Sequence, residues 1–430
     1  MGTALLTDLY ELTMAQSYLG HGKTGTAVFS IFCRSLPGER NFLVACGLET
    51  LIRKLGEFRF TDADIAYLDS LGIFSSDFLS YLRRYRFTGN LYAVPEGTIV
   101  FQNEPLVQIE GPLPDIQMLE TLALNCIHFE TLSASKAARI TGVSRGKSIV
   151  DFGFRRSHMP EAGIAAARAA YITGFSGTSN LEAGRLYGIP VIGTMAHSYI
   201  MLFADEETAF RAYSASFPDR GLFLIDTYDA RTCTDTIIRL AKEGIPVMGV
   251  RIDSGDIPEQ AFTIRKRLDA TGLSRIRIFV SNGVDEYSID KWLAAGVPID
   301  SFGVGTHFIT SSDAPFLDMI YKLVEYEGEP RSKSSPGKAT FPYRRQIQRH
   351  YAGGIMEHDE VVIASGDGGQ GLVRVYLRKG KSVEPLPALA GIRATYESGI
   401  AQLPDRLKTL AKGEYPVIVH QKRDLETGMP

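Results

Sequence analysis

The chain has 430 residues, of which 44% are hydrophobic and 22% are charged, and its formal net charge is −3. This composition predicts a folded protein with a large core and about two or three domains; it argues against disorder and against nucleic acid as a partner. The cysteines (Cys33, Cys46, Cys126 and Cys233) form no Cys-x-x-Cys pair, which argues against a zinc knuckle or a disulfide framework and favours a reducing cytoplasm.

The first 22 residues show no targeting signal. Asp8 and Glu11 interrupt the stretch where a signal peptide would need an apolar run, and Leu6 stands where N-myristoylation requires Ser or Thr. No segment of the chain reaches the roughly 18 apolar residues of a membrane span. We therefore expect a soluble, cytoplasmic protein with no membrane partner.

In chain order, the first strong pattern is β-rich. Residues 87–112 carry apolar runs separated by Gly and Pro turns, which is typical of β-hairpins. Helical spacing follows over residues 115–140 and leads into the central part of the chain.

From about residue 145 to 325 a short apolar run, a loop and a helical stretch repeat. The runs recur every 25 to 40 residues or so, which indicates β-α units around a parallel sheet; they are residues 148–154, 189–194, 221–227, 247–253, 276–282 and 299–306. Helical stretches such as 231–244 and 257–272 each close on a glycine. Because these runs fall short of eight, they predict an irregular or incomplete TIM-like β/α barrel.

The C-terminal part turns β-rich again. Residues 328–342 are rich in Pro, Ser, Gly and Lys, as in a linker, and 343–379 predict further hairpins. The motif GDGGQG at 366–371 precedes a strand, so we interpret it as a hairpin turn and not a dinucleotide fingerprint. We predict an α/β barrel over 116–327 and a β-rich α+β domain assembled from 1–115 and 328–430.

Polar side chains cluster where the predicted barrel strands end. In a parallel barrel these ends and their loops share one face, which is the catalytic one. In strand order they are Arg155 and Arg156; Thr194 and His197; Asp226 and Asp229; Arg251, Asp253, Ser254, Gly255 and Asp256; Ser281, Asn282 and Gly283; Gly303, Gly305 and Thr306.

These residue types point to one chemistry. Arginines and glycine loops bind phosphate or carboxylate, and Asp253 with Asp256 could hold Mg²⁺ or ribose hydroxyls. No lysine stands at these strand ends, which argues against a Schiff-base aldolase. A lone histidine in an apolar run is usually a core residue, but His197 coincides with the anion-binding groups. The sequence therefore predicts a site for a phosphorylated sugar and a metal ion.

Five segments closely resemble the nicotinate phosphoribosyltransferase family. They are TDLYELTMAQSYL (7–19), DFGFRRSH (151–158), GFSGTSNLEAGRLYGIPVIGTMAHS (174–198), RIDSGD (251–256) and FGVGT (302–306), and the resemblance spans about residues 5–310. It implies transfer of the phosphoribosyl group of 5-phosphoribosyl 1-diphosphate to nicotinate, giving nicotinate mononucleotide and diphosphate, with Mg²⁺ and with ATP as co-substrate. It also implies that His197 becomes phosphorylated and that Asp226 orients its ring.

The resemblance assigns further residues by position. Nicotinate binding falls to Tyr10, Thr194, Arg251 and Arg155, with Arg155 also a candidate for the sugar phosphates. Phosphoribosyl and diphosphate binding falls to Asp253, Ser254, Gly255, Asn282, Gly283, Gly303, Gly305 and Thr306, and the metal to Asp253 and Asp256. Tyr10 would come from the partner subunit of a homodimer. A nicotinamide phosphoribosyltransferase and a non-catalytic ligand-binding homologue remain as alternatives.

Overall fold

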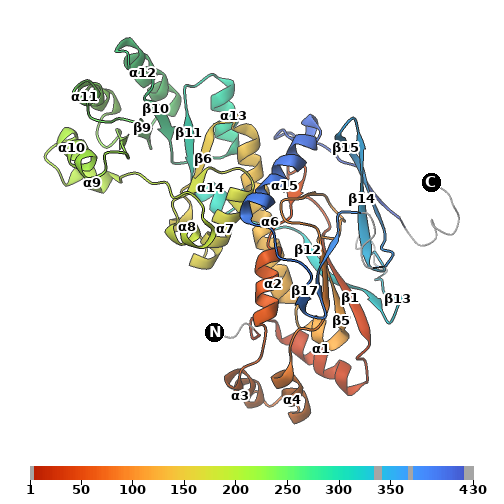
Figure 1. The fold of residues 1–430 in the computed structure, drawn as a ribbon. Helices are drawn as coiled ribbons and strands as arrows, with labels where there is room; N and C mark the ends of the chain where they lie inside the picture. Colours follow the sequence, from red (N-terminus) through yellow and green to blue (C-terminus); the bar gives the residue numbers. More distant parts are fainter. Residues whose placement is uncertain (1–3, 334–340, 367–370, 421–430) are drawn as a thin grey trace. The chain divides into compact units, whose positions relative to one another are not determined.

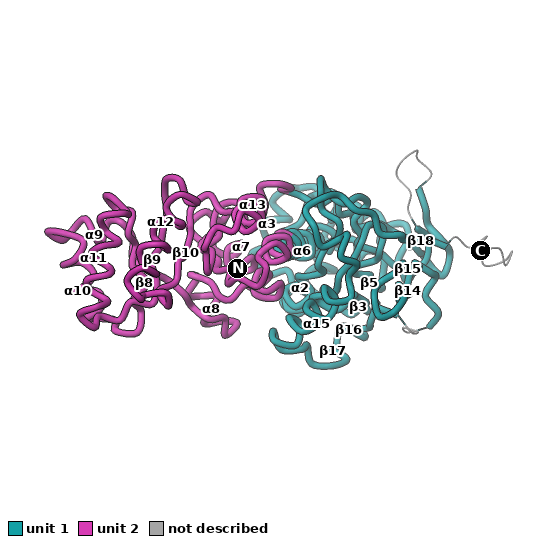
Figure 2. The backbone as a smooth tube through the Cα atoms, turned by 90° about the horizontal axis from the view of Figure 1, so that it is seen from above, with its two compact units in different colours: residues 1–135, 316–430 teal, residues 136–315 magenta. Residues whose placement is uncertain are grey.

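The computed structural model describes residues 4–333, 341–366 and 371–420. The chain divides into two compact units (Figure 2): unit 1 is Met1–Ser135 with Phe316–Pro430, and unit 2 is Lys136–Pro315. Residues 334–340 of the predicted linker and 367–370 of the glycine-rich turn lie outside the described residues.

Unit 1 contains both ends of the chain. Its helices are α1 (Leu9–Gly20), α2 (Leu48–Glu57), α3 (Asp62–Ser70), α4 (Ser76–Arg84), α5 (Leu113–Gln117) and α15 (Leu389–Gln402), and α6 (Glu120–Val143) runs from unit 1 into unit 2. Its strands are β1 (Thr26–Cys33), β2 (Leu43–Val44), β3 (Asn90–Ala93), β4 (Ile99–Val100), β5 (Val107–Pro112), β12 (Met319–Tyr326), β13 (Glu329–Pro330), β14 (Arg345–Ala352), β15 (Ile355–Ile363), β16 (Arg374–Arg378), β17 (Lys381–Ser382) and β18 (Val417–Val419).

The predicted hairpins belong to two different sheets. β3 pairs antiparallel with β5, and β14 pairs antiparallel with β15, as the predicted hairpins require. The larger sheet has the order β13-β12-β1-β5-β3-β16-β17, so β1 from the N-terminal part lies between β5 and the later β12 (Figure 1). The ring of Phe29 on β1 stacks on Tyr321 of β12 with 4.6 Å between centroids. Segments far apart in sequence therefore share one core.

Unit 2 is built around a curled parallel sheet. Its strands are β6 (Ser148–Asp151), β7 (Gly177–Thr178), β8 (Leu222–Leu224), β9 (Gly249–Ile252), β10 (Arg277–Val280) and β11 (Ser301–Val304). Its helices are α7 (Pro160–Ile172), α8 (Leu181–Tyr187), α9 (His197–Met201), α10 (Glu206–Ser216), α11 (Ala230–Lys242), α12 (Ile257–Ala270), α13 (Glu286–Ala294) and α14 (Thr306–Ile309). The order β7-β6-β11-β10-β9-β8, parallel throughout, confirms the incomplete barrel.

Hydrophobic burial explains why these segments are strands. Val250, Ile252, Ile278 and Val280 have no exposed surface, as expected for parallel strands covered on both faces. The predicted helices also end as their glycines indicate: Gly244 follows α11 and Gly272 follows α12, with φ of 91° and 76°, a left-handed conformation that glycine adopts without strain.

One predicted strand is wrong. Residues 189–194 contribute only an isolated bridge between Val191 and Thr178, and the short β7 takes the place in the sheet. Pro190 has no N–H to donate to a ladder. Its carbonyl accepts from Thr178 N at 3.0 Å, and Ile192 N donates to Thr178 O at 3.0 Å. The segment therefore touches the sheet at one point and is free to carry the following residues into the site.

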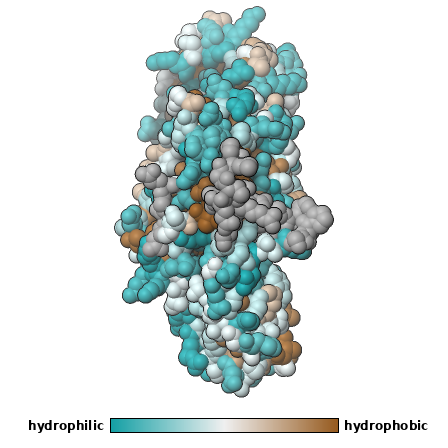
Figure 3. Space-filling model, turned by 90° about the vertical axis from the view of Figure 1, so that its right-hand side faces the viewer, coloured by the Kyte–Doolittle hydropathy of each residue, from teal (hydrophilic) through white to brown (hydrophobic). Residues whose placement is uncertain are grey.

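Across the described residues, no helix is long and apolar enough to cross a membrane. The face drawn in Figure 3 is mostly hydrophilic, with its hydrophobic side chains in small separate patches.

Candidate active site

Two adjoining hollows open at the carboxyl ends of the unit 2 strands. The larger has an empty volume of about 920 Å³, part of it open solvent, and is lined by residues that include Thr194, His197, Arg251 and Asp253. The smaller has an empty volume of about 500 Å³, also partly open solvent, and is lined by residues that include Arg156, Ser281, Asn282, Gly283, Gly303, Gly305 and Thr306. Phe152, Arg155, Arg251 and Asp253 line both. Most of the predicted strand-end residues thus meet around one mouth although they lie far apart in the sequence. The exceptions, which line neither hollow, are Asp226, Asp229, Ser254, Gly255 and Asp256.

His197 faces this mouth. It is the first residue of α9, and 37% of its side chain is exposed. Its Nδ1 lies 3.2 Å from Oγ1 of Thr227, and its Nε2 lies 3.6 Å from Oδ2 of Asp253. His197 is therefore not a sealed core residue, and its ring is held between a hydroxyl and a carboxylate.

Arg251, on β9, joins the strand ends by hydrogen bonds. Its Nε donates to Oγ of Ser281 at 2.8 Å, one terminal nitrogen donates to the carbonyl of Met195 at 3.0 Å, and the other donates to Oδ1 of Asp253 at 2.9 Å. The hydroxyl of Ser281 also donates to Asp253. One guanidinium thus joins the residues after β9 and β10 to the segment that leads into α9, as its rigid fork of donors allows.

Asp253 stays ionised in this setting. Burial raises the pKa of its carboxyl, but hydrogen bonds from Ser281 and Arg251 and the charges of Arg251 and His197 outweigh burial, so the pKa lies below its ordinary value. A carboxylate therefore stands beside Nε2 of His197 at neutral pH.

Asp226 takes a different position from the one predicted. Its Oδ2 accepts from the backbone N–H of Asp253 and from Oγ of Ser254, both at 2.7 Å. The nitrogens of the His197 ring face Thr227 and Asp253 instead. Asp226 thus holds the turn that follows β9, and its Oδ1 is buried without a hydrogen-bond partner among the described residues.

The two carboxylates predicted to bind the metal, Asp253 and Asp256, differ in their positions. Asp253 lines both hollows, whereas the exposed Asp256 caps α12 by accepting from the N–H of Glu259 at 3.0 Å. The unpartnered Oδ1 of Asp226 is a third carboxylate oxygen in the same turn. Carboxylate oxygens are the ligands that Mg²⁺ prefers, and so Asp253 and Asp226 fit such an ion better than Asp256 does.

The glycine loops leave little space behind the smaller hollow. A Cβ on Gly303 would stand 2.7 Å from the ring of Phe152 and 2.9 Å from that of Phe279. Asn282 and Gly283 are both left-handed, with φ of 69° and 66°. Gly255 has φ of 75°, and a Cβ there would meet the side chain of Gln260. These positions keep the backbone close to the hollow, where an anion could approach the N–H groups.

Arg155 is positioned by the end of β6. Asp151 accepts from the N–H of Gly153 and from Oγ1 of Thr178, both at 2.7 Å, and so fixes the turn that carries Arg155. Burial raises the pKa of the Asp151 carboxyl, although these two hydrogen bonds oppose the rise. Arg155 itself is exposed at the mouth.

The remaining predicted nicotinate residues differ in their surroundings. Thr194 lines the larger hollow but donates its hydroxyl to the carbonyl of Leu222 at 2.7 Å. Tyr10 lies on α1 in unit 1, where burial and the nearby Glu120 carboxylate raise the pKa of its phenol. Of the predicted site residues, Tyr10 alone is not part of unit 2.

Sequence reasoning missed several residues at or beside the mouth, among them Phe152 and Thr227. Phe152 lines both hollows, and its ring lies 6.0 Å from the guanidinium of Arg251. Thr227 contacts the His197 ring. Neither side chain is charged, so the pattern of charged residues at the strand ends does not indicate them. Thr227 nevertheless directly follows Asp226 at such an end.

Two family matches cover most of the chain. Residues 5–128 match the nicotinate phosphoribosyltransferase N-terminal domain, and residues 147–330 match the nicotinate phosphoribosyltransferase family.

Individual relatives agree with these matches. The chain is 44% identical to nicotinate phosphoribosyltransferase pncB2 of Mycobacterium tuberculosis over 97% of this chain and 92% of that protein. It is 43% identical to nicotinate phosphoribosyltransferase of Bacillus subtilis, covering 80% of this chain and 73% of the relative. The crystal structure of human nicotinic acid phosphoribosyltransferase superposes with a TM-score of 0.85 at 28% identity, covering 97% of this chain and 98% of that one.

Proposed function

Since this chain belongs to the nicotinate phosphoribosyltransferase family and is an enzyme of NAD biosynthesis, we propose that it transfers the phosphoribosyl group of 5-phosphoribosyl 1-diphosphate to nicotinate and couples the transfer to ATP hydrolysis. The observation that carries this proposal is the hydrogen-bonded group of Arg251, Asp253 and Ser281 beside the ring of His197 in one mouth.

The charge of the mouth supports anionic substrates. Arg155, Arg156 and Arg251 line the smaller hollow against the single carboxylate of Asp253. Guanidinium groups bind phosphate and carboxylate through paired hydrogen bonds. We assign the sugar and leaving phosphates to this hollow, with the backbone of the glycine loops and Thr306, and the nicotinate carboxylate to the side of Arg251 and Arg155.

His197 supplies the link to ATP. Its Nδ1 lies at hydrogen-bond distance from the Thr227 hydroxyl, whereas Nε2 lies 3.6 Å from the Asp253 carboxylate, and we assign the attack on the γ-phosphorus to Nε2. A bond forms between Nε2 and that phosphorus, the bond to the bridging oxygen breaks, and ADP leaves. Asp253 is positioned to stabilise the positive charge that the ring acquires. Water later cleaves the phosphohistidine and releases phosphate.

The transfer step needs positioning and charge stabilisation. The bond from C1′ to diphosphate breaks as the ring nitrogen of nicotinate attacks, and positive charge develops on the sugar. Bound Mg²⁺ would neutralise charge on the departing diphosphate, and Asp253 with Asp226 or Asp256 would hold it. Arg251 keeps Asp253 oriented throughout, because its guanidinium binds that carboxylate and two neighbouring loops.

The proposal extends to assembly and location. We expect a cytoplasmic homodimer in which Tyr10 of the partner subunit stacks on nicotinate. Analytical ultracentrifugation together with complementation of Tyr10→Ala and His197→Ala chains tests the shared site: mixed dimers should regain part of the activity, and no regain would overturn a partner-supplied Tyr10.

The proposed reaction is tested with purified protein, nicotinate, 5-phosphoribosyl 1-diphosphate and Mg²⁺, with and without ATP. We expect nicotinate mononucleotide in both cases and faster formation with ATP. Equal turnover of nicotinamide would overturn the assignment of the base, and absence of any mononucleotide would favour a ligand-binding role.

A further inference from the structure

Histidines gather on one face of the small sheet β14-β15-β18 in unit 1, outside the site described above. His350 lies on β14, His358 and Glu360 lie on β15, and His420 directly follows β18. His350 and His358 are cross-strand partners, and Glu360 pairs with Ile418 of β18. Because alternate residues of a strand share a face, this register brings all four side chains to the same side.

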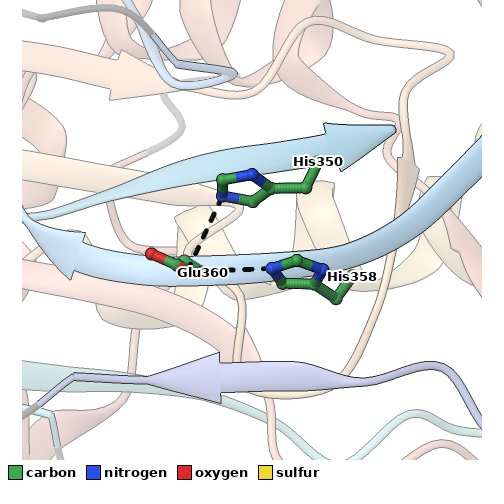
Figure 4. A group of neighbouring side chains, drawn as sticks. All are labelled: His350, His358 and Glu360. Carbon is green, nitrogen blue, oxygen red and sulfur yellow. Dashed lines mark ion pairs between the residues drawn. The ribbon is translucent and has the colours of Figure 1, made fainter. Parts of the chain in front are cut away.

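The imidazole nitrogens converge on one carboxylate. Nε2 of His350 lies 3.8 Å and Nε2 of His358 lies 3.7 Å from Oε1 of Glu360 (Figure 4). Nε2 of His420 lies 3.2 Å from Oε2 of the same residue. One ligand atom each of His350, His358 and Glu360 lies within 4.8 Å of the other two.

These distances are close to those of a zinc site. With metal–ligand bonds of about 2.0–2.2 Å in a tetrahedron, neighbouring ligand atoms are about 3.4 Å apart. The pairs of His350 and His358 with Glu360, at 3.8 and 3.7 Å, would need to close by only a few tenths of an ångström, and the pair of His420 with Glu360, at 3.2 Å, is already within this distance. The four side chains are between 25% and 43% exposed, so an ion can reach them from solvent.

One detail points to a ligand beyond the pairing itself. Nε2 of His350 is a buried atom without a hydrogen-bond partner among the described residues. The rings of His350 and His358 stack, with centroids 4.4 Å apart and planes inclined by 4°. Because an imidazole nitrogen binds a metal in the plane of its ring, one of the two rings has to turn out of this stack when both bind the same ion.

We propose that His350, His358, Glu360 and His420 bind one divalent transition-metal ion of the zinc class. Imidazole with carboxylate suits Zn²⁺ and its neighbours, whereas Mg²⁺ and Ca²⁺ prefer oxygen ligands alone. The ion is structural: it joins the end of β18, a strand of three residues, to the β14–β15 hairpin. The site is independent of the transferase chemistry in unit 2.

The test uses the full chain without a histidine tag, freed of metal by a chelator and titrated calorimetrically with Zn²⁺. We expect one Zn²⁺ per chain after desalting and elemental analysis. The double variant His350→Gln/His358→Gln and the single variant Glu360→Gln should each bind at least tenfold more weakly. Matched controls are His21→Gln, an exposed histidine of unit 1, and His197→Gln in unit 2; both should still bind one ion.

A thermal measurement separates binding from loss of fold. Zn²⁺ should raise the Tm of the parent chain and leave that of the double variant unchanged, because only a native-state ligand stabilises the fold. Metal-free parent and variant should unfold at similar temperatures. Failure of the parent chain to bind Zn²⁺ stoichiometrically, or equal binding by the double variant, would overturn the site.

Discussion

The ring of His197 is positioned by Thr227 in this structure, and this contact gives a first prediction. Thr227→Val removes the hydroxyl that faces Nδ1 and should lower the ATP-stimulated rate about tenfold, the effect of one hydrogen bond of roughly 1–1.5 kcal/mol. The rate without ATP should change little, and Thr227→Ser should restore the stimulation. Rates measured with and without ATP check this expectation; a Thr227→Val enzyme with normal stimulation would contradict it.

The hydrogen bonds of a second single residue, Arg251, give another prediction. Its donors reach Ser281, Met195 and Asp253, and a lysine ammonium cannot reproduce this planar fork. Arg251→Lys should therefore lower kcat/KM for nicotinate by about 10- to 100-fold, corresponding to roughly 1.5–3 kcal/mol for charged hydrogen bonds. The control is Arg275→Lys at an exposed position of the same unit. Steady-state kinetics measure kcat/KM for nicotinate in both variants. Equal values of kcat/KM for Arg251→Lys and Arg275→Lys would show that Arg251 has no special role.

At the residue scale, the sequence identified which residues meet but not their partners. Parallel strands carry their ends to one face, so His197, Arg251 and Asp253 could be grouped from position alone. Hydrogen-bond partners depend on loop geometry that no spacing encodes. Asp226 was therefore assigned to the His197 ring, whereas it binds the turn at Asp253 and Ser254.

At the scale of elements, a buried ion network joins α6 to α13. Nζ of Lys136 lies 2.6 Å from a carboxylate oxygen of Glu286 and 2.8 Å from Asp313, and Arg139 binds the same glutamate at 3.1 Å. Lys136→Met leaves these carboxylates short of a cation and should lower the free energy of unfolding by about 3–5 kcal/mol.

The double variant Lys136→Met/Glu286→Gln is the control for this network. It also removes the negative charge of Glu286, so it should recover part of the free energy of unfolding that Lys136→Met loses. Urea unfolding curves measure both variants. A Lys136→Met protein as stable as its parent would show that the network contributes little.

A pH-dependent pair is formed by Glu104, between β4 and β5, and Asp359 on β15. Burial and the neighbouring Asp359 carboxylate raise the pKa of Glu104 well above its ordinary value. Asp359 is also buried, but hydrogen bonds from Glu104, Arg349 and Tyr415 and the charge of Arg349 hold its pKa below the ordinary value. Folded Glu104 therefore keeps a proton that the unfolded chain loses above about pH 4.5.

The proton that folded Glu104 keeps determines whether stability rises or falls with pH. The stability contributed by protonated Glu104 is fully present below its unfolded pKa and is lost as pH rises through its folded pKa. The side chain introduced by Glu104→Gln cannot ionise. The difference between the free energy of unfolding of this variant and that of the parent should therefore rise in the variant's favour between about pH 5 and pH 8. Urea unfolding at both pH values measures the difference; a constant difference would contradict the assignment.

Element boundaries were predictable where the chain repeats a strong pattern. Buried runs such as Ile278 to Val280 and the glycines after α11 and α12 located strands and helix ends. The two-residue strand β7 was missed because Gly177 and Thr178 carry no apolar run. Residues 189–194 were assigned to a strand on apolar character alone, although Pro190 cannot donate to a ladder.

In the whole molecule, the C-terminal part of the chain belongs to the same compact unit as the N-terminal part. Two later strands of the chain pair with the N-terminal part in one sheet, β12 with β1 and β16 with β3. Hairpin signals on both sides of the predicted barrel indicated a β-rich part at each end, but the predicted barrel boundaries, 116–327, differ from those of unit 2, Lys136–Pro315. The assignment of each flanking strand to one of two sheets was not predictable, because alternation identifies the buried face of a strand but not its neighbour.

The proposed link between ATP hydrolysis and phosphoribosyl transfer through His197 is tested by incubating the protein with γ-labelled ATP. The parent chain should take up acid-labile label, stoichiometric with chains, and lose it on hydrolysis, whereas His197→Ala should take up none and keep slow, ATP-independent transfer. Acid-labile label on the His197→Ala chain, or unlabelled parent chain with full ATP stimulation, would contradict the account.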